Sequence, residues 1–120
     1  EISHYGNLLE SNIHIYRYVT EYLTKQENSS NRELFLSDAT LYLELTGIIT
    51  IAWQWLIQGI AAVEGKRRHQ EGNLADFYDS KIHTMKFFFK YEVPKIHTLF
   101  LTLIDDNVLT VGINEKIFAD

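Results

Sequence analysis

The apolar side chains in the second half of the chain recur at the spacing of an α-helix. Between Tyr78 and Leu103 successive apolar positions lie three or four residues apart, which keeps them on one helix face for about seven turns. This stripe comprises Tyr78, Ile82, Met85, Phe89, Val93, Ile96, Phe100 and Leu103. We therefore predict a helix over 74–104, in which Pro94 produces a kink or releases one backbone hydrogen bond. Asn73 and Asp76, after Gly72, have the spacing of a capping box and mark its start.

A second, longer helix is predicted over 32–68. Ser30 and Glu33 form a capping box after the polar linker 28–31, and Ser37 with Asp38 is a competing start. If it is continuous, this helix is on the order of 55 Å long. It carries two adjacent apolar stripes, the first made of Leu41, Leu45, Ile48, Ala52, Leu56, Gly59 and Val63, the second of Ile49, Trp53, Ile57 and Ile60.

A weaker helical pattern predicts the first helix over 4–27, and residues 108–120 are expected to form a short tail. No window alternates with period two, so no sheet is predicted. Short connections at 28–31 and 70–73 favour antiparallel neighbours. We therefore predict an all-α fold, an antiparallel up-and-down bundle of three long helices.

The helix count becomes four if the chain breaks near Pro94 or near Ser37. We expect the most buried side chains to be Trp53, Leu56, Ile60, Met85, Phe89 and Ile96.

Composition limits the function classes. A chain of 120 residues with 46% hydrophobic and 22% charged residues fits one globular domain over 1–120. Its net charge of −5 argues against binding nucleic acid through bulk charge. The absence of cysteine excludes disulfides, thiolate metal sites and a cysteine nucleophile.

The beginning of the chain also carries an expectation. Residue 1 is Glu and the sole methionine is Met85, which predicts a processed product or a fragment of a longer chain. No secretory signal pattern opens the sequence, so a cytoplasmic location is expected.

One segment is long enough for a membrane span. Residues 45–63 form a run of 19 residues without a charge, of which thirteen are apolar. Thr46, Thr50, Gln54 and Gln58 recur in this run every four residues as a polar stripe. This stripe favours a helix at the centre of a soluble bundle, covered on most sides, over a membrane span.

The sequence shows no residue pattern that marks a catalytic, metal or cofactor site. Glu1 and His4 have the spacing that di-iron bundles use, but the pattern requires a second such pair, and His83 and His97 share a face with lysines. The basic run 66–69 is interpreted as a cationic helix end, and this interpretation is preferred to an anion-binding site. The aromatics around Phe87, Phe88 and Phe89 are interpreted as core, with one ring facing a partner or another domain. We therefore predict no catalytic residue and no metal ligand, and name no cofactor-binding residue.

Two patterned stretches carry a family resemblance. Residues 43–47 and 52–56 resemble part of the long helix in the C-terminal helical domain of a class of acyl-CoA dehydrogenases. Residues 77–81, 87–88 and 93–94 resemble the helix that follows it, with an aromatic pair and a lysine near its start and an aliphatic-proline step further on.

The resemblance covers roughly 34–112 and implies a function for the parent chain. Parents of this class are flavoproteins that oxidise acyl-CoA to 2-enoyl-CoA: a glutamate removes the α proton and FAD accepts the β hydride. In that class the base and most FAD contacts lie upstream of this domain, so FAD is expected in the parent and not on these 120 residues. The implied partners are the upstream dehydrogenase domains of the same chain. The rival interpretation is a free-standing helical interaction module.

We also expect the chain to associate with a second copy of itself. Three helices cannot enclose a helix that is apolar on two stripes, and Trp53 and Trp55 lie about 200° apart at 100° per residue. We therefore expect a homo-oligomer, a two-fold dimer through the second or third helix.

Overall fold

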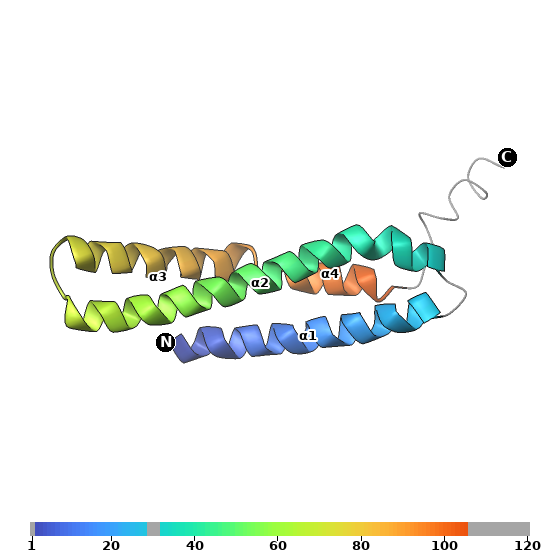
Figure 1. Ribbon diagram of the computed structural model, residues 1–120, viewed down its shortest axis with the longest axis horizontal. Coiled ribbons are helices and arrows are strands. Elements are labelled where there is room, and N and C mark those ends of the chain that lie inside the picture. Colours follow the sequence, from blue (N-terminus) through green and yellow to red (C-terminus); the bar gives the residue numbers. More distant parts are fainter. Residues whose placement is uncertain (1, 29–31, 106–120) are drawn as a thin grey trace.

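The computed structural model describes residues 2–28 and 32–105, and four α-helices make up nearly all of this part of the chain. They are α1 (Ile2–Asn28), α2 (Arg32–Arg68), α3 (Asn73–Tyr91) and α4 (Lys95–Leu103). Helix α2 runs antiparallel to the other three in an elongated bundle of 69 × 28 × 17 Å (Figure 1). The described residues contain no strand. The predicted all-α antiparallel bundle is therefore confirmed.

The predicted helix ranges also agree with the structure, apart from one break. Helix α1 extends the predicted 4–27 by a few residues at its ends, and α2 has the predicted bounds and continues through residue 37. The predicted third helix is interrupted by a turn at 92–94, so that α3 and α4 are its two parts and the count is four. Pro94 lacks the N–H that helix continuation needs, and it occupies the N-cap position of α4 with a φ of −62°.

The predicted capping box at Asn73 and Asp76 is wrong. Gly72 occupies the N-cap position of α3 with a φ of 87°, and no side chain caps this end. Its carbonyl oxygen accepts the backbone N–H of Asp76 at 3.2 Å. Because glycine adopts this left-handed conformation without steric cost, the helix begins one residue earlier and Asn73 is already inside it. The capping box at Ser30 and the tail at 108–120 lie outside the described residues.

The core lies between one face of α2 and the three other helices. Leu45, Ile48 and Ala52 from the first apolar stripe of α2 are buried there, which confirms that this stripe faces the core. The side chains packed with them are Leu9, Val19 and Leu23 from α1, Met85 and Phe89 from α3, Val93 from the turn, and Ile96, Leu99 and Leu103 from α4. Three residues predicted to be most buried are confirmed, since Met85, Phe89 and Ile96 are at most 4% exposed.

The burial predicted for Trp53, Leu56 and Ile60 is wrong. Trp53 is 52% exposed and Ile60 is 51% exposed, and Leu56, on the first stripe, is only partly buried. The face of α2 that meets α3 carries glycines instead, Gly59 against Met85 and Gly65 against Tyr78. Small side chains let two helix backbones approach closely, whereas Trp53, Ile57 and Ile60 of the second stripe are exposed. Helix α2 is thus covered on one side and not, as expected, on most sides.

A hydrogen-bonded cluster joins α1 to α2. The rings of Tyr16 and Tyr42 stack with their centroids 5.5 Å apart, and the Tyr42 hydroxyl donates to that of Tyr16 at 3.1 Å. Tyr16 also pairs with the Thr46 hydroxyl at 2.9 Å, and Tyr42 with that of Thr20 at 2.7 Å. Burial raises the pKa of the Tyr42 hydroxyl. These contacts set the register of α1 on α2, because each hydroxyl has partners in this alignment.

Glycine at position 65 is expected to be required by packing. A Cβ at Gly65 would lie 2.5 Å from Cζ of the Tyr78 ring, whereas a Cβ at Gly47 would meet nothing within 4 Å. Gly65→Ala should lower the free energy of unfolding by about 1–3 kcal/mol through overpacking. The control Gly47→Ala should raise it by about 0.5–1 kcal/mol, because alanine favours the helix. Urea denaturation followed by circular dichroism measures both, and equal stabilisation by the two substitutions would contradict the close α2–α3 packing.

Candidate functional site

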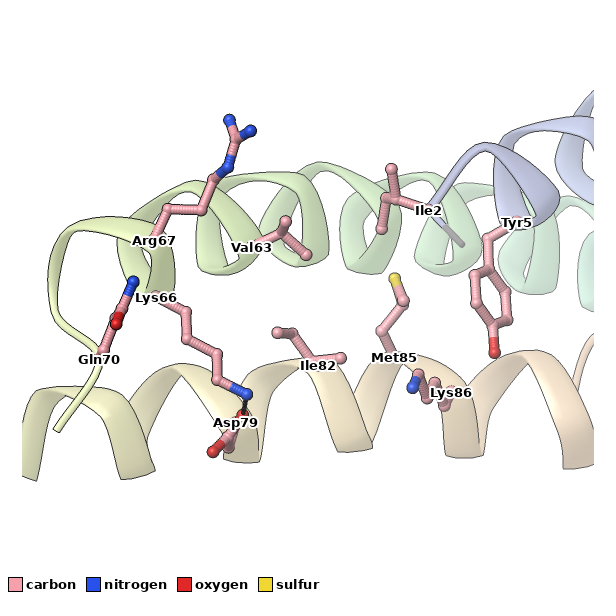
Figure 2. A pocket seen from close by; sticks show the side chains of 10 residues that line it. All are labelled: Ile2, Tyr5, Val63, Lys66, Arg67, Gln70, Asp79, Ile82, Met85 and Lys86. Atoms are coloured by element: carbon pink, nitrogen blue, oxygen red, sulfur yellow. Dashed lines mark ion pairs between the residues drawn. The ribbon is translucent and has the colours of Figure 1, made fainter.

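A groove of about 670 Å³ lies between the C-terminal half of α2 and helix α3 (Figure 2). It is lined by Ile2 and Tyr5 from α1, Val63, Lys66 and Arg67 from α2, Gln70 from the connection, and Asp79, Ile82, Met85 and Lys86 from α3. Figure 1 shows why it is open: the hairpin of α2 and α3 extends well past the N-terminal end of α1. The groove therefore lies beyond the N-terminal end of α1.

The floor of the groove is apolar and its edges are charged. Val63 and Ile82 are partly buried and Met85 is buried, and Ile2 and Tyr5 close the end nearest α1. An ion pair crosses between the two helices, with Nζ of Lys66 2.6 Å from Oδ1 of Asp79 (Figure 2). The groove thus combines an apolar floor with cations that lie at its edge.

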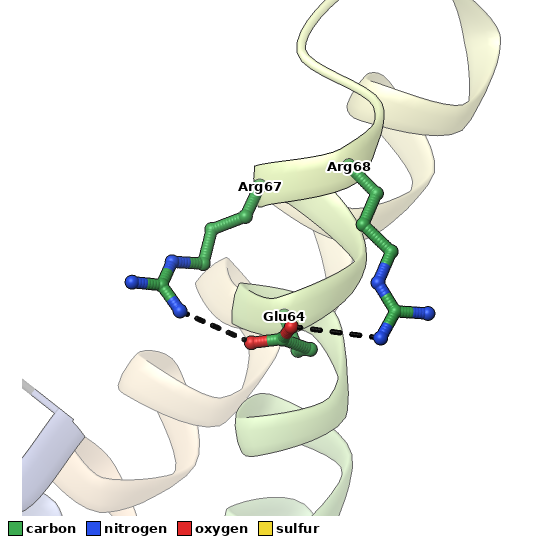
Figure 3. Close-up of polar contacts among 3 residues, drawn as sticks. All are labelled: Glu64, Arg67 and Arg68. Atoms are coloured by element: carbon green, nitrogen blue, oxygen red, sulfur yellow. Dashed lines mark hydrogen bonds and ion pairs between the residues drawn. The ribbon is translucent and has the colours of Figure 1, made fainter.

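Glu64 holds two arginines at the end of α2. Its carboxylate lies 3.3 Å from Arg67 and 3.7 Å from Arg68, and the two guanidinium groups extend to opposite sides of the helix (Figure 3). Arg67 lines the groove, and Arg68 is not among its lining residues. The prediction that the basic run forms a cationic helix end is confirmed, since Lys66, Arg67 and Arg68 occupy the last turn of α2.

The titratable groups with shifted pKa values lie away from this groove. Burial, reinforced by the nearby Asp105 carboxylate, raises the pKa of Asp38 near the start of α2. The exposed Lys95 has a raised pKa because it donates a hydrogen bond to Glu92 at 2.8 Å. Neither side chain lines the groove.

The histidines do not gather into a metal site within the described residues. His4, His14, His69, His83 and His97 are all exposed, and no group of three His, Asp or Glu side chains in this part of the chain could hold a metal ion. Glu1, the partner in the spacing noted for His4, lies outside the described residues.

The aromatic run is divided between core and surface, as predicted. Phe89 is buried and Phe88 partly buried, whereas Phe87 is 55% exposed. The exposed Phe87 ring lies 4.7 Å from that of Tyr91, centroid to centroid. One ring of the three therefore faces away from the bundle.

Within the described residues, one segment, Asp38–Arg68, passes a length and composition test for membrane spans. A single such helix is weak evidence for a span, and 22% of its apolar window is buried inside the bundle. Two members of its polar stripe contact other helices: Thr46 hydrogen bonds Tyr16, and Gln58 accepts a hydrogen bond from Lys81 at 3.5 Å.

Sequence reasoning missed the groove, although its signal was present in the helix lengths. The ranges 4–27 and 32–68 differ by 13 residues, about 20 Å of helix. An antiparallel partner that is this much shorter must leave one end of the longer helix uncovered. Ile82 and Met85 were placed on the core stripe, and Met85 is buried there, whereas Ile82 is only partly buried beyond the end of α1.

The comparison with family models gives one match. Residues 1–111 match the model described as Acetyl-CoA dehydrogenase C-terminal like. The chain belongs to this family. Comparisons with curated proteins and with solved structures gave no significant match. The match extends over nearly the whole chain, and it includes the residues of all four helices and of the groove.

In this member of the acetyl-CoA dehydrogenase C-terminal-like family, the ion pair across the groove is expected to be weak. A double-mutant cycle with Lys66→Ala and Asp79→Ala should give a coupling of about 0.2–1 kcal/mol in the free energy of unfolding, because both side chains are about half exposed. The coupling should fall as salt is added. The matched cycle of Arg68→Ala with Asp79→Ala should give none, and equal coupling in both cycles would contradict the pairing.

Proposed function

We propose that this chain is the non-catalytic C-terminal helical domain of an FAD-dependent acyl-CoA dehydrogenase. The family match over residues 1–111 carries this proposal. The parent chain oxidises acyl-CoA to 2-enoyl-CoA in the cytoplasm, with its base and FAD contacts upstream of these residues. The helical domain serves packing or assembly and binds no flavin by itself.

The exposed apolar surface of α2 supports a packing role. Trp53, Ile57 and Ile60 are 52%, 45% and 51% exposed, and their spacing places them on one side of the helix. We call these three residues the α2 face. Large apolar side chains grouped in this way mark surfaces that contact protein, because water around them is unfavourable. We propose that upstream domains or a second copy of the chain cover this face.

The parent chain provides the decisive test of the function. We expect its reading frame upstream of Glu1 to encode a dehydrogenase core with a candidate glutamate base. The purified full chain should carry FAD in a one-to-one ratio and reduce it on addition of an acyl-CoA, whereas the isolated 120 residues should bind none. Absorption spectra of the two proteins measure this. An unrelated sequence or a stop codon upstream would support a free-standing interaction module instead.

The α2 face leads to a prediction about self-association. We expect the isolated chain to form a two-fold dimer that buries more than about 1,000 Å². Trp53→Ser should weaken the dimer by about tenfold or more in Kd, because central aromatic residues dominate interface energies. Tyr18→Ser on α1 is the control, since Tyr18 is equally exposed at 55%. Sedimentation equilibrium measures both, and a monomer at high micromolar concentration would refute the dimer.

A further inference from the structure

The hairpin of α2 and α3 has a second seam, on the side of α3 away from the groove. Three side chains gather there around the ammonium group of Lys81, namely Trp55 and Gln58 from α2 and Phe77 from α3. None of these four residues lines the groove, whereas Asp79 does. Asp79 is two residues from both Phe77 and Lys81, which places it about 200° around the helix from each. We call the four residues the Lys81 seam.

The ammonium group of Lys81 is held over this seam without a counter-charge. It lies 5.7 Å from the centre of the Trp55 ring and 5.5 Å from that of Phe77, and it donates a hydrogen bond to Oε1 of Gln58 at 3.5 Å. The aromatic faces attract the cation and so keep it in place. Lys66 has a carboxylate partner, whereas Lys81, although partly buried, forms no ion pair within the described residues. The seam therefore presents one uncompensated positive charge.

The surroundings of this charge are apolar. Phe77 is 52% exposed, and Ile51, one turn before Trp55 on the same side of α2, is 48% exposed. Leu74, two turns before Lys81 on α3, is 49% exposed. Exposed apolar side chains grouped in this way mark a surface that contacts protein. A protein that covered them would also cover the ammonium group of Lys81, which is unfavourable unless a negative charge accompanies it.

A second copy of the chain fits the seam poorly, and so does an anionic membrane. Two copies that met seam to seam would bring both Lys81 ammonium groups together, and no residue of the seam supplies a carboxylate. The net charge of −5 on the chain opposes contact with an anionic lipid surface. The seam is also separate from the α2 face proposed for the dimer, because Trp55 lies about 200° around α2 from Trp53.

We propose that the Lys81 seam binds the dehydrogenase part of the parent chain, through an apolar surface with a carboxylate that pairs with Lys81. This inference rests on the function proposed above, in which these residues are the C-terminal domain of that chain. The pair fixes how the domain is oriented on its partner, because a displaced carboxylate would leave the covered ammonium group alone.

Amine labelling tests whether the seam is covered. Lys90 is the matched control, since it is exposed, lies 5.2 Å from the centre of the Tyr91 ring, and is about 180° around α3 from Lys81. Peptide mass spectrometry measures the rate at which an N-hydroxysuccinimide ester acetylates both lysines, in the full parent chain and in the isolated 120 residues. The Lys81 rate divided by the Lys90 rate should be about fivefold or more lower in the full chain, because a covered, paired amine reacts only when the contact opens.

Charge reversal tests for the carboxylate. The 120 residues contain no cysteine, so Ile51→Cys adds a thiol beside the seam, and its rate of maleimide labelling reports covering in the full chain. Lys81→Glu should raise this rate by about fivefold or more through repulsion of the carboxylate, whereas Lys81→Arg should keep the protection because it keeps a positive charge on the aromatic rings. Lys90→Glu should change the rate by less than about twofold. Circular dichroism checks the fold of each variant, and the amine measurement needs no substitution.

Each of four results would overturn the proposal. An equal ratio of lysine rates in the full chain and in the isolated residues would show that nothing covers the seam. Protection of Lys81 in the isolated residues that rises with protein concentration would identify a second copy as the occupant, and protection there by phosphatidylserine vesicles would identify a lipid surface. Protection in the full chain that Lys81→Glu leaves unchanged would refute the carboxylate. The FAD measurement on the full chain is independent of all four, so failure of the proposed function is recognised separately.

Discussion

Every other helix of the bundle packs against α2, and α3 does so over the greatest length. The cause lies in the size of the side chains along this helix. Where α2 meets α3, Gly59 and Gly65 lie against Met85 and Tyr78, which fill the space that a larger residue would need. Because helices pack best where their backbones come close, this small-residue face determines which way α2 is turned. Trp53, Ile57 and Ile60 are exposed as a direct consequence.

The same rotation explains how the polar groups of α2 are used. Thr46, which interrupts an apolar run, is placed against Tyr16 and joins the cluster that aligns α1. Gln58 is placed beside Lys81, whose ammonium group lies 5.7 Å from the centre of the Trp55 ring and 5.5 Å from that of Phe77. Helix α2 is as long and apolar as a membrane span, but its position in this bundle is fixed by polar contacts with neighbouring helices.

Helix positions could be predicted from the sequence because they depend on neighbours along the chain. The periodicity from Tyr78 to Leu103, the polar linkers and Pro94 act within a few residues, and they placed α1 and α2 within two residues of their bounds. Burial depends on contacts between helices, and size alone placed Trp53 and Ile60 in the core wrongly. The start of α3 was misjudged for a related reason, since a glycine at positive φ can replace a side-chain cap. The groove was missed because no local motif marks it. It results from the difference in length between two helices.

Within the described bundle, the C-terminal end of α2 packs against α3 alone, which affects the local stability of the domain. A bundle in which α3 and the end of α2 form a two-helix hairpin buries less apolar surface there than a three-helix section of the same length. The residues at this end have the periodicity of a core stripe, so their apolar character exceeds what the described helices cover. Local opening is easiest where the fewest apolar contacts must be broken, which makes this hairpin the first part of the fold expected to open. Contacts from outside the bundle would therefore stabilise the domain most at this end, where the apolar floor and the cationic edge already coincide.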